Sequence, residues 1–375
     1  MRSAASRLHK GFSYERRFAA CEAYAVKDAA AWAGQWAYWA PGGAKRAEPF
    51  AHVVLDLGCG KGEYTVACAR ARPDVLFVGF DVDAICTLRS AEQAAAAGVD
   101  NAVFLLAEDP FAAAEDGQCA LAGASGAGGV PALAPIDAHA SRASRAASGA
   151  PHRSGAPAEL DLACVFAPGE LACILMNFPT PFPKKKKAHL RLTYLDRLMG
   201  YRRLLREGAG IRLRTDSQPL RDFSLTQFEL AGYRVARRID DVRAACPDEP
   251  WSAYERKLVE QGARALGVFA VPGSAPAHVQ QTAPLSLVSY LPDNLDALDY
   301  VPHGMQGCVE NLRNRHAHER ARGVLSFARP SSSRIAARTA CRPLCGALNI
   351  SNNRSSALMH RVCSRRGSML RSDTK

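Results

Sequence analysis

The sequence predicts an α/β fold with a mostly parallel sheet, and three observations lead to this expectation. From position 49 onward, short apolar runs alternate with segments of helical periodicity. A glycine-rich turn joins the first of these runs to the helical segment that follows it. The chain has 375 residues, of which 48% are hydrophobic, and this is enough for one such domain with insertions.

Each expected strand is a short apolar run bounded by turn-forming or polar residues. Six strands are expected at residues 52–57, 75–80, 102–106, 171–178, 210–215 and 233–239. Four helices are expected between them, at residues 63–71, 84–97, 193–205 and 219–230. A further strand near residues 267–271 closes a hairpin with the sixth. The prediction is a seven-stranded, mostly parallel sheet with helices on both faces.

The regions outside these elements differ sharply in composition. Residues 1–48 are expected to form a helical extension that docks on the central domain, since three of the four tryptophans lie there. The central domain spans residues 49–273 and is interrupted at 112–158 by a stretch without aromatic residues, which predicts a disordered insertion. Residues 274–324 are expected to pack on the body, and residues 325–375 to form a basic, disordered tail.

The net charge of +12 belongs mainly to the end of the chain. Positions 301–375 carry thirteen Arg and one Lys against three acidic residues, which leaves about +1 for the first 300 residues. Twelve cysteines lack the spacing of a disulfide framework or a zinc site, so no metal is expected. No apolar run reaches the ~20 residues of a membrane span. The expected location is therefore a soluble, reducing compartment, the cytoplasm.

The turn after the first strand predicts a small-molecule site. Its glycines, Gly58 and Gly60, allow a sharp turn and a close approach of the backbone to a ligand. Asp81 ends the second strand, 23 residues after Gly58, where a carboxylate can accept hydrogen bonds from both ribose hydroxyls. Glu108 follows the third strand, near the expected place of an adenine.

Three nucleotide ligands compete for this turn. A P-loop would need a serine or threonine after Lys61, where this sequence has Gly62. A dinucleotide would bring a pyrophosphate toward Asp56, which would repel it. The same carboxylate would attract the ammonium group of S-adenosylmethionine, so a methyl donor is preferred.

The fourth strand ends in an unusual run that reads Asn177-Phe-Pro-Thr-Pro-Phe-Pro183 and continues into four lysines, 184–187. Prolines at alternate positions keep the chain extended and prevent a helix from starting. In open α/β sheets, ligands bind at the carboxyl ends of the strands. A stiff, aromatic loop followed by concentrated positive charge at that edge indicates a polyanion whose base is presented to the small-molecule site.

This run resembles the F-x-D-P-W-P-K-K-R-H-x-K-R-R-L signature of the tRNA (guanine-N7)-methyltransferases. Two further blocks are similar to those of the family: Thr215-Asp216 after the fifth strand, and Ser252-Ala-Tyr-Glu255-Arg-Lys257, which resembles T-x-[YF]-E-x-[KR]. The three blocks occur in the family's order over about residues 49–271. The resemblance implies a Rossmann-like class I methyltransferase that uses S-adenosylmethionine to methylate N7 of a guanine in the variable loop of tRNA.

The resemblance also implies roles for individual residues. The expected cofactor-binding residues are Asp56, Gly58, Gly60, Asp81, Glu108 and Asn177. The expected tRNA- and guanine-binding residues are Lys184, Lys185, Arg191, Thr215 and Ser252. The expected catalytic residues are Thr180, Asp216 and Glu255.

Thr180 stands where the family has an aspartate, and a neutral hydroxyl offers less to a guanine that is becoming positively charged. Asp216 and Glu255 are therefore expected to supply the negative charge. A rival interpretation is a tRNA-binding protein that keeps the cofactor fold without turnover, but such a protein would not need the intact glycine turn. Methylation of a small molecule or a protein would leave the four lysines unexplained.

Overall fold

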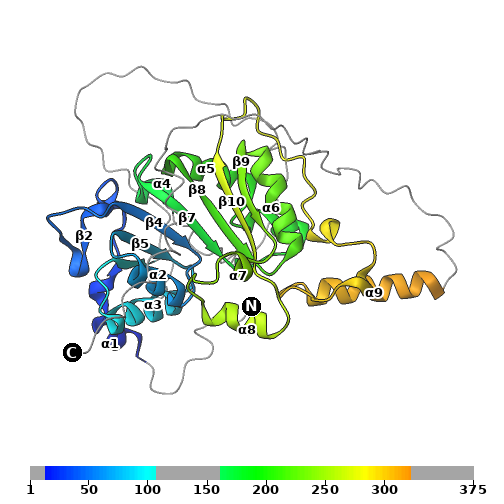
Figure 1. Ribbon diagram of the computed structural model, residues 1–375, viewed down its shortest axis with the longest axis horizontal. Helices are drawn as coiled ribbons and strands as arrows, with labels where there is room; N and C mark the ends of the chain where they lie inside the picture. The colour runs from blue at the N-terminus through cyan, green and yellow to red at the C-terminus, as the bar shows by residue number, and fades with distance from the viewer. Residues whose placement is uncertain (1–12, 107–160, 322–375) are drawn as a thin grey trace, which may run out of the picture.

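The computed structural model describes residues 13–106 and 161–321 (Figure 1). The predicted insertion at 112–158 and the predicted basic tail at 325–375 lie outside the described residues, as does Glu108. Within the described ranges, no helix has the length and apolar character needed to cross a bilayer.

The central sheet has eight strands in the order β1-β6-β5-β4-β7-β8-β10-β9. Their bounds are β1 (Ala25–Val26), β4 (His52–Leu57), β5 (Val75–Phe80), β6 (Ala102–Leu105), β7 (Leu171–Asn177), β8 (Leu205–Thr215), β9 (Tyr233–Ile239) and β10 (Leu266–Pro272). All neighbours are parallel except the pairs made by β10, which is antiparallel to both β8 and β9. The predicted α/β class is confirmed; the sheet has eight strands instead of seven because β1 adds a two-residue edge.

Helices cover both faces of this sheet. The helices α2 (Glu63–Ala71) and α3 (Ala84–Ala97) bury their apolar side chains in one core, while α5 (Leu195–Leu204) and α6 (Gln218–Leu230) pack into the other. Alternate residues of β5 enter the two cores, as the two-residue period of a strand requires. Because crossover connections return each strand in the same direction, the carboxyl ends of β4, β5, β7 and β8 meet at one edge.

Most predicted boundaries agree with the structure, but β8 begins earlier than expected. It starts at Leu205, directly after α5 ends at Leu204, instead of at residue 210. The β7–β8 register shifts between Leu171 and Cys173, which accommodates the added residues. Glycines in this segment hide the strand from a search for continuous apolar runs.

The N-terminal segment is less helical than predicted. Among the described residues 13–48, only α1 (Tyr14–Ala19) is an α-helix. Besides β1, the other elements are η2 (Glu22–Tyr24), η3 (Ala30–Trp32), η4 (Trp36–Tyr38), η5 (Pro41–Gly43), β2 (Trp39–Ala40) and β3 (Ala44–Lys45). Gly34, Gly42 and Gly43 adopt positive φ, which interrupts helical geometry. Trp36 and Trp39 are fully buried, and the Trp36 indole donates a hydrogen bond to the Val165 carbonyl. The tryptophans therefore extend the core.

The remaining elements lie outside the sheet and its four main helices. They are α4 (Leu162–Val165), η6 (Lys185–Leu190), α7 (Val242–Ala245), α8 (Ala253–Glu260), η7 (Leu287–Tyr290), η8 (Leu295–Ala297) and α9 (Gln306–Ala321). Leu287 and Met305 pack with Leu220 and Phe223 of α6 in a third apolar cluster. The C-terminal segment is thereby attached to the body before α9, which projects away from it (Figure 1).

Candidate active site

The turn between β4 and α2 is built from glycines in left-handed conformations. The φ angles of Gly58, Gly60 and Gly62 are 81°, 59° and 77°. A Cβ on Gly62 would lie 2.6 Å from the Ser90 Cβ of α3, so packing as well as conformation requires glycine there. A Cβ on Gly60 would meet no protein atom within 4 Å. This side of the turn can be approached by a ligand.

Asp81 holds this turn against the start of α3. One of its carboxylate oxygens accepts a hydrogen bond from the Gly60 N–H at 3.0 Å, and the other accepts one from the Asp83 N–H at 2.9 Å. Burial raises the pKa of Asp81 above its ordinary value. Each carboxylate oxygen can accept a second hydrogen bond, so the predicted contact with a ribose remains compatible with this arrangement. The neighbouring Val82 is 61% exposed and offers an apolar surface that the sequence prediction missed.

Asp56 does not face the ligand side as predicted. Its carboxylate is buried, accepts a hydrogen bond from the Thr65 hydroxyl at 2.6 Å, and accepts another from the Asn177 amide at 3.2 Å. Burial raises its pKa to about 6. The β4 backbone directs the side chain beneath the turn in this structure, so the predicted direct pairing with an ammonium group stays a prediction. Asp56 instead orients Asn177, as a residue behind the ligand-binding surface would.

Asn177 is the residue at this edge that fits a cationic ligand. Its Nδ2 donates to Asp56, while its Oδ1 is buried without a hydrogen-bond partner among the described residues. An unpaired buried oxygen is costly unless a donor satisfies it. An ammonium group is such a donor, and the site lies where β7 ends beside the glycine turn.

The proline loop after β7 is held in an unusual conformation. Phe178 and Phe182 have φ angles of 50° and 43°, which are uncommon for bulky side chains. Arg191 fixes this loop from behind: its Nε donates to the Pro181 carbonyl at 3.0 Å and its Nη2 donates to the Phe182 carbonyl at 2.7 Å. The same guanidinium lies over the Phe223 ring.

Arg191 therefore faces the interior in this structure, and the predicted phosphate contact has no support from its position. It is 0% exposed, and burial lowers its pKa to about 10. The sequence suggested a surface position one turn beyond the lysines, but the loop carbonyls draw the side chain inward. Lys184 and Lys185 are exposed, as are the two lysines that follow. Their predicted contact with phosphates stays a prediction.

Glu255 is also placed differently from the prediction. It is 1% exposed and forms ion pairs at 2.6 Å with Arg214 and Arg243. Ser252 caps α8 by accepting a hydrogen bond from the Glu255 N–H at 3.0 Å. The carboxylate is neutralised in this structure by one buried and one mostly buried guanidinium group, so the expected contact of Glu255 with a substrate stays a prediction. Glu255 ties α8 to β8.

Asp216 lies at the surface of the same region. Its Oδ2 accepts hydrogen bonds from the Tyr300 hydroxyl at 2.8 Å and from the His303 N–H at 2.9 Å. Asp216 is half-buried, whereas Thr215 is buried and its hydroxyl accepts from the Ser217 N–H at 3.0 Å. Thr180 is half-buried in the proline loop. Sequence reasoning missed Tyr300 and His303, which come from the C-terminal segment.

Three rings line the acceptor side, and we call Phe178, Tyr254 and His303 the aromatic wall. The ring centroids of Phe178 and Tyr254 are 6.0 Å apart, and those of Tyr254 and His303 are 6.1 Å apart, both edge to face. Burial and the nearby Asp216 raise the pKa of Tyr254 to about 12. The Ala253 N–H at the start of α8 donates to Glu63 at 2.6 Å, which links the wall to the glycine turn.

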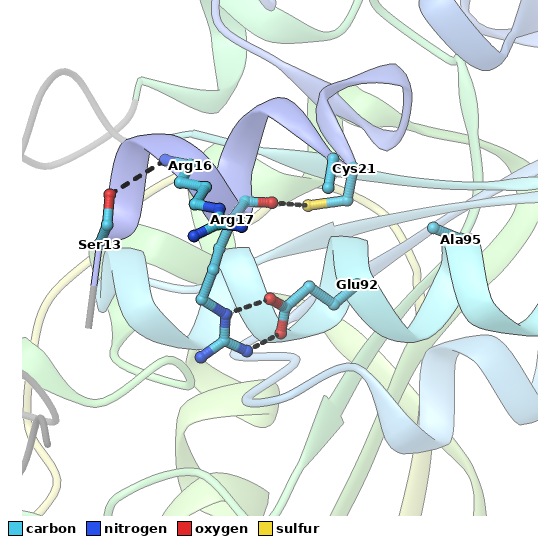
Figure 2. Close-up of a pocket in the computed structure, with 7 residues that line it drawn as sticks. Ser13, Arg16, Arg17, Cys21, Glu92 and Ala95 are labelled. Atoms are coloured by element: carbon cyan, nitrogen blue, oxygen red, sulfur yellow. Dashed lines mark hydrogen bonds and ion pairs between the residues drawn. The ribbon is translucent and has the colours of Figure 1, made fainter. Parts of the chain in front are cut away.

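A separate cavity of about 520 Å³ lies between α1 and the later turns of α3 (Figure 2). Arg17 reaches across it and forms an ion pair with Glu92. Because α3 runs antiparallel to the strands, its later turns lie away from their carboxyl ends. This cavity is not part of the site described above. Among the described residues, no group of three or more His, Cys, Asp and Glu side chains is arranged to hold a metal ion.

Comparison with known proteins finds that the chain is similar to methyltransferases. A family model described as "Putative methyltransferase" matches residues 51–111 and 157–266. The tRNA (guanine-N(7)-)-methyltransferase of Geobacillus kaustophilus is 25% identical over 252 residues, 66% of this chain and 88% of the relative. That of Christiangramia forsetii is 27% identical over 215 residues, 56% of this chain and 74% of the relative.

Solved structures give only distant matches. The crystal structure of the 16S rRNA methyltransferase KamB is 14% identical, covers 60% of this chain and 89% of its own, and has a TM-score of 0.36. The fold assignment rests on the strand order given above.

Proposed function

We propose that this chain belongs to the tRNA (guanine-N7)-methyltransferase family and that it transfers a methyl group from S-adenosylmethionine to N7 of a guanine in the variable loop of tRNA. The main support for the proposal is that two features lie at the same edge of the sheet. They are the glycine turn after β4 and the proline loop after β7, which continues into exposed lysines. The predicted cytoplasmic location follows from a tRNA substrate and is part of the proposal.

The residues at the glycine turn fit the cofactor. The backbone at Gly58 and Gly60 would accommodate it closely, Asp81 would accept hydrogen bonds from its ribose, and Asn177 Oδ1 would accept one from its ammonium group. S-adenosylmethionine, when bound, supplies a methyl group that its sulfonium makes electrophilic. Asp56 contributes indirectly by fixing the Asn177 amide.

The acceptor requires orientation more than proton transfer. Guanine N7 already carries a free lone pair, so no residue has to remove a proton from it. The aromatic wall and the stiff proline loop would align the base and exclude water, which are the main contributions that the protein makes to such a reaction.

Asp216 is the best candidate for stabilising the positive charge that develops on the guanine ring. It is half-buried beside the aromatic wall, whereas Glu255 is already neutralised by two arginines. Thr180 would contribute a hydrogen bond without charge. The rival interpretation, a tRNA-binding protein without turnover, does not account for the glycine turn, whose Gly60 is open to the approach of a ligand.

A transcript that lacks N7 provides the sharpest test. The full chain, S-adenosylmethionine and a tRNA transcript should yield 7-methylguanosine, which mass analysis of the digested nucleosides detects. The matched control transcript carries 7-deazaguanosine, in which a C–H replaces N7, and should yield no methylated product. Methylation that persists on the deaza transcript, or a different methylated nucleoside from the normal one, would overturn the assignment to N7.

A further inference from the structure

A short segment between η8 and α9 reaches the acceptor side from outside the family match, which ends at residue 266. We call residues 300–305 the strap. The strap contacts Asp216 through the Tyr300 hydroxyl and the His303 N–H. The His303 ring lies edge to face against Tyr254. The strap therefore joins the carboxylate that follows β8 to a ring on α8.

The strap is firmly anchored at its C-terminal end. Met305 is 0% exposed, packs with Leu220 and Phe223, and its sulfur lies 3.5 Å from the Ser217 hydroxyl. Upstream, the Leu287 N–H donates to the Pro183 carbonyl at 3.0 Å. Since both flanks of the strap are attached to the proline loop or to α6, its position is determined by packing.

The strap also closes against the proline loop. Gly304 has a φ of 82°, and a Cβ there would lie 3.3 Å from the Pro181 Cγ. A larger residue would be strained by its conformation and would press on the loop. Gly304 thus lets the strap turn directly beside the proline loop on its way to α9.

Tyr300 is suited to hold the Asp216 carboxylate in place. Burial and the adjacent Asp216 carboxylate both raise the pKa of Tyr300, so its hydroxyl remains a donor at neutral pH. A carboxylate has about four acceptor positions on its two oxygens, and the strap uses two of them on Oδ2. Asp216 remains only half-buried, so the strap orients it without covering it completely.

The geometry points to the strap as the part of this chain that completes the acceptor pocket: Tyr300 is a positioning residue for Asp216, and His303 forms the outer face of the aromatic wall against which the base lies. The inference rests on the proposed function for the identity of that base, guanine. If the strap instead blocked the site, Tyr300 would be inhibitory. Tyr300→Phe would then raise kcat, whereas a positioning role predicts that it lowers kcat.

A double-mutant cycle on the full chain tests the positioning role. Tyr300→Phe should lower kcat about tenfold with little change in KM for tRNA, because the hydroxyl acts through Asp216. In an Asp216→Asn background, the same substitution should lower kcat less than about twofold. Tyr290→Phe is the matched control: its hydroxyl lies on the same C-terminal segment, donates to the Pro284 carbonyl at 3.0 Å and has Thr226, not Asp216, as its side-chain partner.

His303→Ala tests the wall and keeps the backbone N–H that Asp216 uses. It should raise KM for tRNA several-fold and leave kcat nearly unchanged, whereas His278→Ala, an exposed histidine of the same segment, should change neither. Equal effects of Tyr300→Phe and Tyr290→Phe, fully additive effects in the cycle, or a rise in kcat with Tyr300→Phe would each overturn the inference.

The strap and the proposed function can fail separately. If the wild-type chain makes a methylated nucleoside other than 7-methylguanosine, the proposed function fails and the same cycle is measured on that product. If it makes none, the affinity of each variant for guanosine monophosphate, measured by calorimetry, is compared in place of kcat. His303→Ala should then weaken binding relative to His278→Ala, whereas Tyr300→Phe should leave binding nearly unchanged. Unchanged binding in His303→Ala would overturn the inference without any turnover measurement.

Discussion

The cofactor side of the site comes from one local stretch and a neighbouring strand end, whereas the acceptor side is assembled from segments far apart in the chain. Gly58, Gly60 and Asp81 act through backbone geometry that their own sequence imposes. The acceptor side joins the proline loop, the end of β8, the start of α8 and the strap. This difference shows that a charged residue in a family-like motif can stabilise the fold instead of contacting substrate, because its place in the motif does not determine its solvent exposure.

The largest expected effect is a loss of stability when Glu255 is substituted. Glu255→Gln removes the partner of Arg214 and Arg243 in a buried environment, so the free energy of unfolding should fall by about 3–5 kcal/mol. Urea denaturation measures it, with Glu229→Gln on the exposed face of α6 as the control. A stable Glu255→Gln protein with reduced turnover would show that the carboxylate acts on substrate after all.

Asp216 should show the opposite pattern. Asp216→Asn should lower the single-turnover methylation rate by about a hundredfold, because a charge near the developing cation is lost. Affinity for tRNA and stability should change little, since one face of the side chain is already open to solvent. Asp299→Asn makes the same charge change at an exposed position beside the strap and should leave the rate unaltered. A rate loss matched by an equal loss of tRNA affinity would contradict the catalytic role.

The burial of Asp56 should make the free energy of unfolding depend on pH. Because burial raises its pKa from 3.8 to about 6, the folded state holds this proton more tightly than the unfolded chain does. The contribution of Asp56 to stability is therefore complete below pH 3.8 and is lost as the pH rises through about 6. Asp56→Asn should stabilise the ligand-free protein by about 1–3 kcal/mol at pH 7 and by little near pH 4.

Urea denaturation at the two pH values checks this expectation, with the exposed Asp100→Asn as the control. A variant less stable than the wild type at pH 7 would show that Asp56 is charged and well paired in the folded state.

The smallest effect concerns the lysines. Lys184→Gln combined with Lys185→Gln should weaken binding to all tRNAs and reduce the slope of log affinity against log salt by about 1.5–2. The pair Lys27→Gln and Arg70→Gln removes equal charge elsewhere and should not change the slope. Filter binding over a range of salt concentrations measures both. If the two pairs behave alike, the lysines 184–187 are only a solvated surface.

The sequence by itself determined the elements and the cofactor turn. Apolar runs located β4, β5 and β9 at the residues observed, and Gly58 and Gly60 indicated the sharp turn after the first strand. These features depend on interactions among near neighbours in the chain. The shift in the start of β8 and the 3₁₀ turns of the N-terminal segment were missed, because they depend on register and packing against the sheet.

Only the tertiary structure decided which charged side chains face the acceptor. Arg191 and Glu255 lie in blocks that resemble the family signature, yet the first holds loop carbonyls and the second neutralises two arginines. Tyr300 and His303 carried no sequence signal at all and reach Asp216 across more than eighty positions. The physical reason is that burial and partner choice are properties of the assembled packing, in which a long side chain such as Arg191 follows the nearest unsatisfied acceptors.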